Sequence, residues 1–472
     1  MAVLAVKEYQ RIHCGEEFDP ANRIVTRAQH QQLERFNDDY ERRLKIKVFQ
    51  HGPRQSLVAQ NFVGIINLGR DQVEVLPKID SATTSVRRSL VRMIAEVLAL
   101  DLHGNGETRA DRHTDSILEI LVRLFCEQLW QAVRRGMVRR YEGRTDNLTV
   151  LRGRLSMRDQ LRENLARPDR LYCAFDEFSE NNLLNQVLKA ALRVLHRVAR
   201  SQANLRNIAE LLFCFQDVDD VAPAEFRWEL LSTDRLSSRY KPLLRMARLF
   251  IEGQSPDVVT GAGQGFALLF DMNDLFEGYI GAVARRVFGR RGLQVALQGP
   301  KLHLAQHADG AGVFELRPDI VVSNGATVEF IIDTKWKQLK RAELREGVGS
   351  ADAYQMHAYA TQYAAPEVVL LYPHHAELGA WKSRRALYLL RDPGGGTKRP
   401  PRRFGVATVD LGYLDEIEQR LEDMFPESAR TVAAFRPASF DMGAPLVDLT
   451  HATALAADVE DDALIAKLRA GR

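Results

Sequence analysis

The sequence predicts an α+β protein with several domains: a β-rich N-terminal domain, a mainly helical middle region and a C-terminal α/β domain with a mixed central sheet. Three observations predict this order. The apolar residues have the period of strands over residues 44–79, the period of helices over residues 116–250, and form strands separated by helices after residue 265. The predicted parts of the 472-residue chain are residues 1–110, 111–260, 261–425 and 426–472.

The predicted N-terminal β unit rests on three apolar runs, "LKIKVFQ", "FVGIINLG" and "QVEVLPKI". They are short and rich in β-branched residues, and the turn signal "LGRD" separates the last two. The helical middle region rests on "SILEILVRLFCEQLWQAVRRGMVRRY", where apolar side chains recur at helical spacing. That stripe consists of Ile117, Leu121, Leu124, Phe125 and Leu129.

The predicted C-terminal domain follows the glycine-rich run "GAGQG" at residues 261–265. This run lacks the Lys-Ser or Lys-Thr pair of a phosphate-binding loop, so we interpret it as a domain linker. A helix over residues 268–288 then leads into the strands "FELRPDIVV", "VEFIIDTKW", "VVLLYP" and "FGVATVDL", with a further helix around residues 354–363. Residues 426–472 are alanine-rich with scattered acids, which is typical of a loosely attached tail.

The composition is that of a globular protein without a strong charge. Hydrophobic residues make up 45% of the chain, and 65 basic residues nearly balance 62 acidic ones, for a formal net charge of +3. Any basic surface for nucleic acid must therefore be local. The arginines of the loop at residues 391–403 suit nonspecific contact with a DNA backbone, although a plain flexible insertion is the more common meaning of its glycines and prolines.

Cysteine use and hydropathy favour the cytoplasm. The cysteines form no CxxC pair, and no histidine cluster has zinc spacing, which favours reduced thiols. No apolar stretch approaches the roughly 20 residues of a membrane span. The N-terminus also reaches charged residues too soon for a signal peptide. We therefore expect a cytoplasmic protein that does not enter a membrane.

The apolar strand "VEFIIDTKWK" ends in polar residues. Residues two apart on a strand share a face, so Ile331, Asp333 and Lys335 are predicted to lie on the same side as Glu329. The preceding "RPDIVV" and the turn signal "SNGAT" predict a β-hairpin. We predict a three-residue loop with a glycine bulge, which sets Asp319 across from Ile331 and diagonal to Asp333.

Two carboxylates and a lysine at one end of a sheet suit metal-assisted hydrolysis of a phosphodiester. Mg²⁺ prefers carboxylate oxygens and usually takes only one or two of them from the protein. The ion polarises the scissile phosphate and activates a bound water, while the lysine orients that water and offsets developing charge. A solvated strand end or a Pro-Asp turn explains each fragment alone. Their conjunction in an apolar sheet favours the site, because the alternative buries two carboxylates without a partner.

The same residues resemble the PD-(D/E)xK nuclease motif. Asp319 matches the PD position, and Asp333, Thr334 and Lys335 match D-x-K. The resemblance implies an α/β nuclease domain in which Asp319, Asp333 and Lys335 are catalytic. It also implies a magnesium site formed by the two aspartates, the Thr334 backbone carbonyl and a further acid, for which Glu277 in "DLFEGYI" is the candidate.

A second element resembles a feature of some of these nucleases. Gln355 and Tyr359 in "DAYQMHAYA" lie one helical turn apart, like the QxxxY element that follows the lysine and contributes to the catalytic site. An ordinary amphipathic helix is the alternative interpretation of this pair. The solvated flank of an apolar stripe is the alternative for Glu277.

Three longer segments resemble those of one particular family of nucleases. "FVGIINLGRDQVEVLPKI", "LTVLRGRLS" and "FDEFSENNLLNQVLKAAL" are similar, in this order, to successive signatures of McrC proteins, and with the nuclease motif they span most of residues 44–410. Turn or scaffold roles are the simpler interpretation of four residues in these signatures, Lys78, Arg152, Gly153 and Asn182.

McrC proteins are the nuclease subunits of methylcytosine-dependent restriction systems, which serve in phage defence. The resemblance implies an N-terminal part that engages a hexameric AAA+ GTPase called McrB. That partner would bind GTP and read 5-methylcytosine, and the C-terminal part of this chain would be a Mg²⁺-dependent endonuclease acting on double-stranded DNA.

Two other classes of function stay open. One is a stand-alone DNA nuclease or repair enzyme that needs no GTPase partner. The other is a non-catalytic adaptor that retains the nuclease fold only for assembly. The presence of Asp319, Asp333 and Lys335 argues against the adaptor.

Overall fold

The computed structural model describes residues 2–100, 116–231, 237–255, 265–340, 347–390 and 401–426. The chain divides into two units, Met1–Met424 and Phe425–Arg472. The tail predicted at residues 426–472 lies outside the described residues apart from its first residue. The same holds for the linker "GAGQG" apart from its last glycine, and for most of the loop at residues 391–403.

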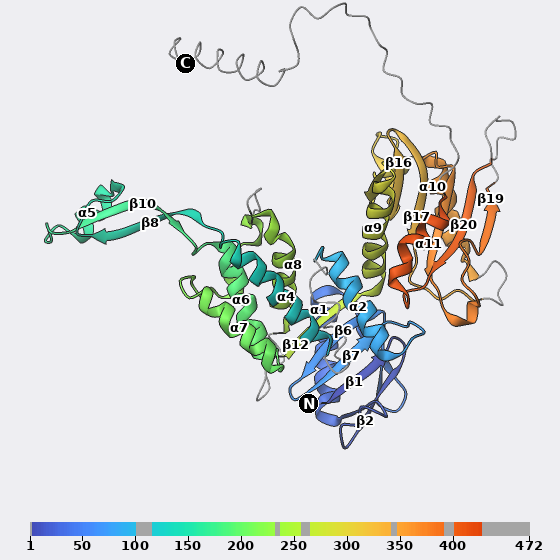
Figure 1. Ribbon diagram of the computed structural model, residues 1–472, viewed down its shortest axis with the longest axis horizontal. Coiled ribbons are helices and arrows are strands. Elements are labelled where there is room, and N and C mark those ends of the chain that lie inside the picture. Colours follow the sequence, from blue (N-terminus) through green and yellow to red (C-terminus); the bar gives the residue numbers. More distant parts are fainter. Residues whose placement is uncertain are drawn as a thin grey trace, which may run out of the picture. The chain divides into compact units, whose positions relative to one another are not determined.

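Two sheets form the N-terminal part of the first unit (Figure 1). One has the strand order β1-β7-β6-β12-β11 and the other the order β3-β2-β5-β4. β1 runs parallel to β7, whereas β7 pairs antiparallel with β6, β6 with β12 and β12 with β11. The strands are β1 (Val3–Lys7), β2 (Arg11–Gly15), β3 (Ile24–Thr26), β4 (Phe49–Gly52), β5 (Ser56–Ala59), β6 (Phe62–Leu68), β7 (Asp71–Leu76), β11 (Gln254–Ser255) and β12 (Gly265–Asp271).

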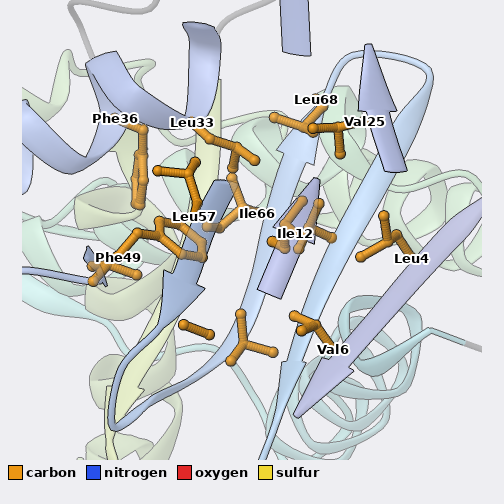
Figure 2. Packing of buried hydrophobic residues seen from close by; sticks show 14 of the residues in the cluster. Leu4, Val6, Ile12, Val25, Leu33, Phe36, Phe49, Leu57, Ile66 and Leu68 are labelled. Atoms are coloured by element: carbon orange, nitrogen blue, oxygen red, sulfur yellow. The ribbon is translucent and has the colours of Figure 1, made fainter. Parts of the chain in front are cut away.

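Helix α1 (Arg27–Leu44) contributes to the apolar core of this part. Thr26 begins the helix with a capping box, in which its hydroxyl accepts from the Gln29 N–H and the Gln29 side chain accepts from the Thr26 N–H. Figure 2 shows Leu33 of α1 beside Leu57 of β5, and both side chains are fully buried at 0% exposure. Burial of this kind stabilises by roughly 1.5–3 kcal/mol for each large apolar side chain.

The strands predicted from "FVGIINLG" and "QVEVLPKI" are confirmed as β6 and β7. The strand predicted from "LKIKVFQ" is wrong in its first half. Helix α1 continues to Leu44, and Lys45 ends it in the left-handed conformation with φ 61°. β4 therefore starts only at Phe49, because the capped helix outweighs the short alternating pattern.

The middle region contains the predicted helices and a sheet that was not predicted. Ser116 caps α4, and the predicted apolar stripe of that helix is buried. The additional sheet has the order β8-β10-β9. Most residues of β8 are exposed, so the strand lacks the alternation that identifies a half-buried strand. The elements here are α2 (Thr83–Val97), α4 (Ile117–Arg134), β8 (Arg140–Leu148), β9 (Arg154–Leu155), α5 (Met157–Glu163), β10 (Leu171–Ser179), α6 (Leu183–Val198), α7 (Gln202–Cys214) and α8 (Lys241–Glu252).

A six-stranded sheet of order β13-β16-β17-β18-β20-β19 dominates the C-terminal part. β17 runs antiparallel to β16 and parallel to β18, so the sheet is mixed as predicted. The elements are α9 (Met272–Arg290), β13 (Gln294–Leu297), β14 (Leu302–Gln306), β15 (Gly312–Leu316), β16 (Ile320–Asn324), β17 (Thr327–Thr334), α10 (Ser350–Gln362), β18 (Glu367–Pro373), β19 (Ala386–Leu389), β20 (Arg403–Val409) and α11 (Ile417–Met424). Short 3-10 helices are η1 (Pro223–Glu225), η2 (Trp228–Leu230), η3 (Ser238–Tyr240), η5 (Ala376–Leu378) and η6 (Leu414–Glu416).

Strand β17 is covered on both faces. Phe330 packs edge-on against Phe288 of α9, with ring centroids 5.0 Å apart. Ile331 belongs to an apolar cluster with Met356 and Tyr359 of α10. A strand buried in this way can end in polar side chains only where those side chains find partners, because burying them unpaired costs several kcal/mol.

The helix predicted over residues 268–288 starts later. Residues 265–271 form β12, which pairs with β6 of the N-terminal sheet, and Asp271 then caps α9 by accepting from the Asn273 N–H. An apolar run without a turn signal does not separate strand from helix.

Among the described residues, no helix has the length and apolarity to cross a membrane, and the four cysteines are free thiols.

Candidate active site

The hairpin of β16 and β17 brings the two predicted aspartates together, but in a different register. Asn324 pairs with Thr327, and after a bulge Ile320 pairs with Ile332. The predicted pairing of Asp319 with Ile331 is therefore wrong. The loop has two residues, 325 and 326, instead of three, and the bulge in β17 shifts the register by one residue more. Continuing the observed register sets Asp319 in line with Asp333.

The bulge also changes the predicted faces of β17. Val322 pairs with Phe330 but its neighbour Ser323 pairs with Val328, so Glu329 is the additional residue. Val328 packs against the same cluster as Ile331. The strict alternation predicted from Glu329 to Lys335 therefore holds only beyond the bulge.

Asp333 is the most deeply buried acid of the site. It is 1% exposed, and Lys335 Nζ lies 2.8 Å from its Oδ2. That oxygen is buried and accepts no well-directed hydrogen bond from the described residues. Burial and the nearby Asp319 raise the pKa of Asp333, and Lys335 only partly offsets them. An additional positive charge at the site would therefore stabilise the ionised form of the Asp333 carboxylate.

Asp319 is held by Thr334 of the neighbouring strand. The Thr334 N–H and hydroxyl each donate to Asp319 Oδ2, at 2.7 Å. Burial raises the pKa of Asp319, while these two hydrogen bonds lower it. Thr334 thus orients Asp319 through its amide and its hydroxyl. The role of the Thr334 carbonyl as a metal ligand stays a prediction.

Gln355 and Tyr359 of α10 join the site through one chain of hydrogen bonds. Lys335 Nζ donates to Gln355 Oε1 at 3.1 Å, and Gln355 Nε2 donates to the Tyr359 hydroxyl at 2.8 Å. The hydroxyl in turn donates to the Arg317 backbone carbonyl at 3.1 Å. The chain links Lys335 to the segment that carries Asp319, so the predicted QxxxY pair belongs to the site geometrically.

Lys335 has a strong electrostatic reason to stay charged. Burial of the ammonium acts to lower its pKa, but Asp333 and Asp319 outweigh this effect and raise it. The ammonium therefore remains protonated at neutral pH and supplies a fixed positive charge and hydrogen-bond donors. It is not suited to act as a general base.

Glu277 of α9 lies near the aspartates but contacts another side chain. Gln298 Nε2 donates to its Oε1 at 2.9 Å. Burial and the charge of Asp319 both raise the pKa of Glu277. The described residues contain no group of three or more His, Cys, Asp or Glu side chains that could hold a metal ion. The role of Glu277 as a third carboxylate ligand therefore stays a prediction.

Sequence reasoning missed Gln298. Its N–H donates to the Asp319 carbonyl at 2.8 Å, its amide nitrogen donates to Glu277, and its amide oxygen accepts from Arg317. It adopts a left-handed conformation with φ 53°. The sequence "LQGP" signals a turn there but gives no sign that the side chain joins two parts of the site.

Asp352 is a second residue that was missed. It lies in the first turn of α10, and its charge raises the pKa of both Asp333 and Lys335. Residues 352, 355 and 359 share one helix face at helical spacing. Extending the QxxxY pattern by one turn would have found this acid.

The four residues in the longer signatures have structural contacts. Lys78 donates its N–H to Glu8, and Arg152 lies over the Phe175 ring at 4.1 Å. Gly153 has φ 68° beside the carbonyl of Ala174, where a Cβ would meet the oxygen at 2.4 Å. Asn182 caps α6 by accepting from the Asn185 N–H. These contacts fit the turn and scaffold roles expected for the four residues.

Comparison with known proteins identifies the family. The family model described as McrBC 5-methylcytosine restriction system component matches residues 57–373. None of the curated proteins compared with the chain matches it. Among the solved chains that are similar, two come from Thermococcus gammatolerans assemblies.

The first comes from a refined half-complex of a tetradecameric assembly of McrB AAA+ hexamers with bound McrC. It has 18% identity and a TM-score of 0.63, with 89% of this chain and 99% of that chain covered. The second comes from a cryo-EM structure of the McrBC complex, with 21% identity, a TM-score of 0.48, and 61% and 88% coverage. At such identity the first match shows a common fold. Because the family model covers most of its length, this chain belongs to the family of McrBC 5-methylcytosine restriction system components.

Proposed function

We propose that this chain is the endonuclease subunit of a modification-dependent, McrBC-like restriction system, which cleaves DNA by magnesium-assisted phosphodiester hydrolysis and stimulates a partner AAA+ GTPase. The observation that carries the proposal is the arrangement of Asp319, Asp333 and Lys335 at the end of one buried hairpin. Lys335 Nζ lies 2.8 Å from Asp333 Oδ2, and Thr334 holds Asp319 at 2.7 Å. We assign this C-terminal part to the PD-(D/E)xK nuclease fold.

The donor set fits magnesium. Asp333 offers a buried oxygen that accepts no well-directed hydrogen bond from the described residues, although Lys335 Nζ lies 2.8 Å away, and a second carboxylate is nearby. Asp319, Asp333, the Thr334 carbonyl and Glu277 would hold the ion, and two carboxylates are enough because Mg²⁺ keeps several waters. When bound, the ion polarises the phosphate and lowers the pKa of its water.

The chain's own residues divide the remaining work. The Lys335 ammonium is fixed between Asp333 and Gln355, where it can orient the attacking water and offset charge on the phosphate oxygens. Tyr359 keeps Gln355 in place and ties it to the Arg317 carbonyl. Gln298 holds Glu277 beside the segment of Asp319. Such preorganised charge contributes a few kcal/mol to catalysis in hydrolases.

The partner we propose is a McrB-like AAA+ GTPase hexamer that binds GTP. Support comes from the family and from the structural neighbour solved with McrB AAA+ hexamers and bound McrC. The middle region adds a physical argument, because the sheet of β8 and β10 and the segment after α5 expose large apolar side chains. Tyr141 is 74%, Phe178 54% and Leu165 80% exposed. Tyr141 and Phe178 also contact each other, and contiguous exposed apolar side chains are typical of a surface that binds another protein.

Reconstitution tests this proposal against a nuclease that acts alone. The assay combines the chain, a McrB-like AAA+ GTPase, duplex DNA with 5-methylcytosine, Mg²⁺ and GTP. One component is omitted at a time. We expect cleavage only in the complete mixture. Cleavage with Mg²⁺ but without the GTPase would support the stand-alone enzyme. An absence of cleavage in a mixture whose GTP turnover is stimulated would support the adaptor.

A further inference from the structure

A buried contact joins the N-terminal part to the residue that follows Lys335. The Trp336 indole N–H faces both carboxylate oxygens of Glu8, at 3.0 and 3.1 Å. Glu8 directly follows β1 and is 1% exposed. Its Oε2 also accepts the Lys78 N–H at 3.0 Å. Glu8 follows β1 and Lys78 follows β7, so this bond fixes the carboxylate within the N-terminal β unit.

Trp336 also contacts the helix that carries Glu277. Its ring centroid lies 5.4 Å from that of Phe276, a fully buried residue that directly precedes Glu277 in α9. The ammonium of Lys335 contacts Asp333 and Gln355 instead. Two consecutive side chains thus face two different surroundings, the candidate site on one side and the N-terminal part on the other.

The backbone leaves strand β17 at this point. Thr334 is the last residue of β17, and the Lys335 N–H makes one more bond, to the Leu371 carbonyl at 2.9 Å. A tight turn then follows, with the Lys337 N–H bonded to the Lys335 carbonyl at 2.9 Å. The anchored indole of Trp336 therefore restrains how the backbone leaves the strand, and with it the direction of the Lys335 side chain.

We propose that Glu8 is a positioning residue of the nuclease site, which acts through Trp336 to fix Lys335. The inference rests on the proposed nuclease function. It means that the N-terminal part supplies a support for the catalytic lysine. A change in the N-terminal part that moves Glu8 would then alter the position of Lys335, although 327 residues of sequence separate the two. Misplacing a catalytic group by about 1 Å can cost roughly 100-fold in rate.

The experiment uses the full-length chain with its GTPase partner and measures single-turnover cleavage over a range of DNA concentrations. We compare Glu8→Ala, Trp336→Phe and the double variant. Trp336→Phe keeps an aromatic ring beside Phe276 but removes the indole N–H together with the second ring of the indole. Each single variant is expected to lower the rate at saturating DNA about tenfold, with an unchanged half-saturating DNA concentration. The double variant should be no slower than either single one, because both changes break the same contact.

Two further variants separate positioning from loss of folding. Glu8→Gln keeps one acceptor oxygen for the indole and should recover part of the rate. Glu119→Ala is the matched control, because Glu119 is a carboxylate of 7% exposure that accepts from Arg200 and Asn204 in the helical region. It should lower the thermal unfolding temperature without lowering the rate of the folded complex.

The proposal is overturned if the two single effects multiply to about 100-fold in the double variant, since the residues would then act independently. It is also overturned if Glu119→Ala slows cleavage as much as Glu8→Ala. Failure of the proposed nuclease function looks different. In that case Asp333→Ala would cleave as fast as the unchanged chain, whatever the Glu8 variants do.

Discussion

The sheet that carries the candidate site and the sheet of the middle region depart from the usual distribution of side chains in opposite ways. In the hairpin of β16 and β17, charged groups are buried, and Asp333 is only 1% exposed. In the sheet of β8 and β10, apolar groups are exposed, and Tyr141 and Phe178 pair across the strands with ring centroids 4.9 Å apart. Buried charge needs a counter-charge, whereas exposed apolar surface needs a cover. On this difference rests our proposal that one sheet performs the chemistry and the other binds the partner.

The largest effect is expected for Lys335→Ala. It removes the charge beside Asp333 and the donor to Gln355, so DNA cleavage should fall by at least about 100-fold. GTP turnover by the partner, measured in the same mixture, should stay unchanged because the middle sheet is intact. Lys335→Arg should not restore cleavage, since a planar guanidinium does not match the position of an ammonium. Residual cleavage within about twofold of normal would remove the lysine from the mechanism.

A smaller effect, on partner binding and not on cleavage, is expected for Leu165→Ser. Leu165 is 80% exposed, so its replacement should change the free energy of unfolding by less than about 0.5 kcal/mol. If the surface binds the GTPase, the partner concentration needed for half-maximal stimulation should rise about tenfold. Cleavage at saturating partner should be normal. Arg162→Ser, which removes an exposed charged side chain of α5, is the control, and an equal shift for both variants would contradict an apolar contact.

A third effect concerns the pH dependence of stability and leaves both cleavage and partner binding aside. Burial raises the pKa of Glu8 from 4.5 to about 7, although hydrogen bonds from Lys78 and Trp336 lower it. Between these values the folded chain binds more protons than the unfolded chain, so the contribution of Glu8 to stability falls as pH rises, by up to about 3 kcal/mol. Denaturant unfolding should therefore show Glu8→Gln gaining stability relative to the unchanged chain from pH 5 to pH 8. A difference that is constant with pH would place the pKa of Glu8 near its ordinary value.

The sequence was most informative where burial and chemistry coincide. The strands β6 and β7, helix α4 and the end of β17 follow from apolar patterns and from polar residues that interrupt them. Asp319, Asp333 and Lys335 were found because an apolar strand rarely ends in paired charges. Gln355 and Tyr359 were found because helical spacing fixes their common face.

The remaining features depend on long-range contacts that no local pattern carries. The bulge at Glu329 sets the hairpin register, and Gln298 joins Glu277 to the segment of Asp319 only in the folded chain. β12 pairs with β6 across about 200 residues of sequence. A fragment made to test stimulation of the GTPase should therefore end after Asp271, because a fragment that ends at the predicted domain boundary after residue 260 would lose β12.

Asp333→Ala tests the central claim most directly when cleavage of methylated duplex DNA and GTP turnover are measured in the same complex. Glu329→Ala is the matched control, because it removes a carboxylate from the same strand at the bulge. We expect Asp333→Ala to abolish cleavage while GTP turnover stays stimulated, and Glu329→Ala to leave both intact. Full cleavage by Asp333→Ala, or a loss of GTP stimulation that accompanies the loss of cleavage, would contradict the division between a catalytic sheet and a partner-binding sheet.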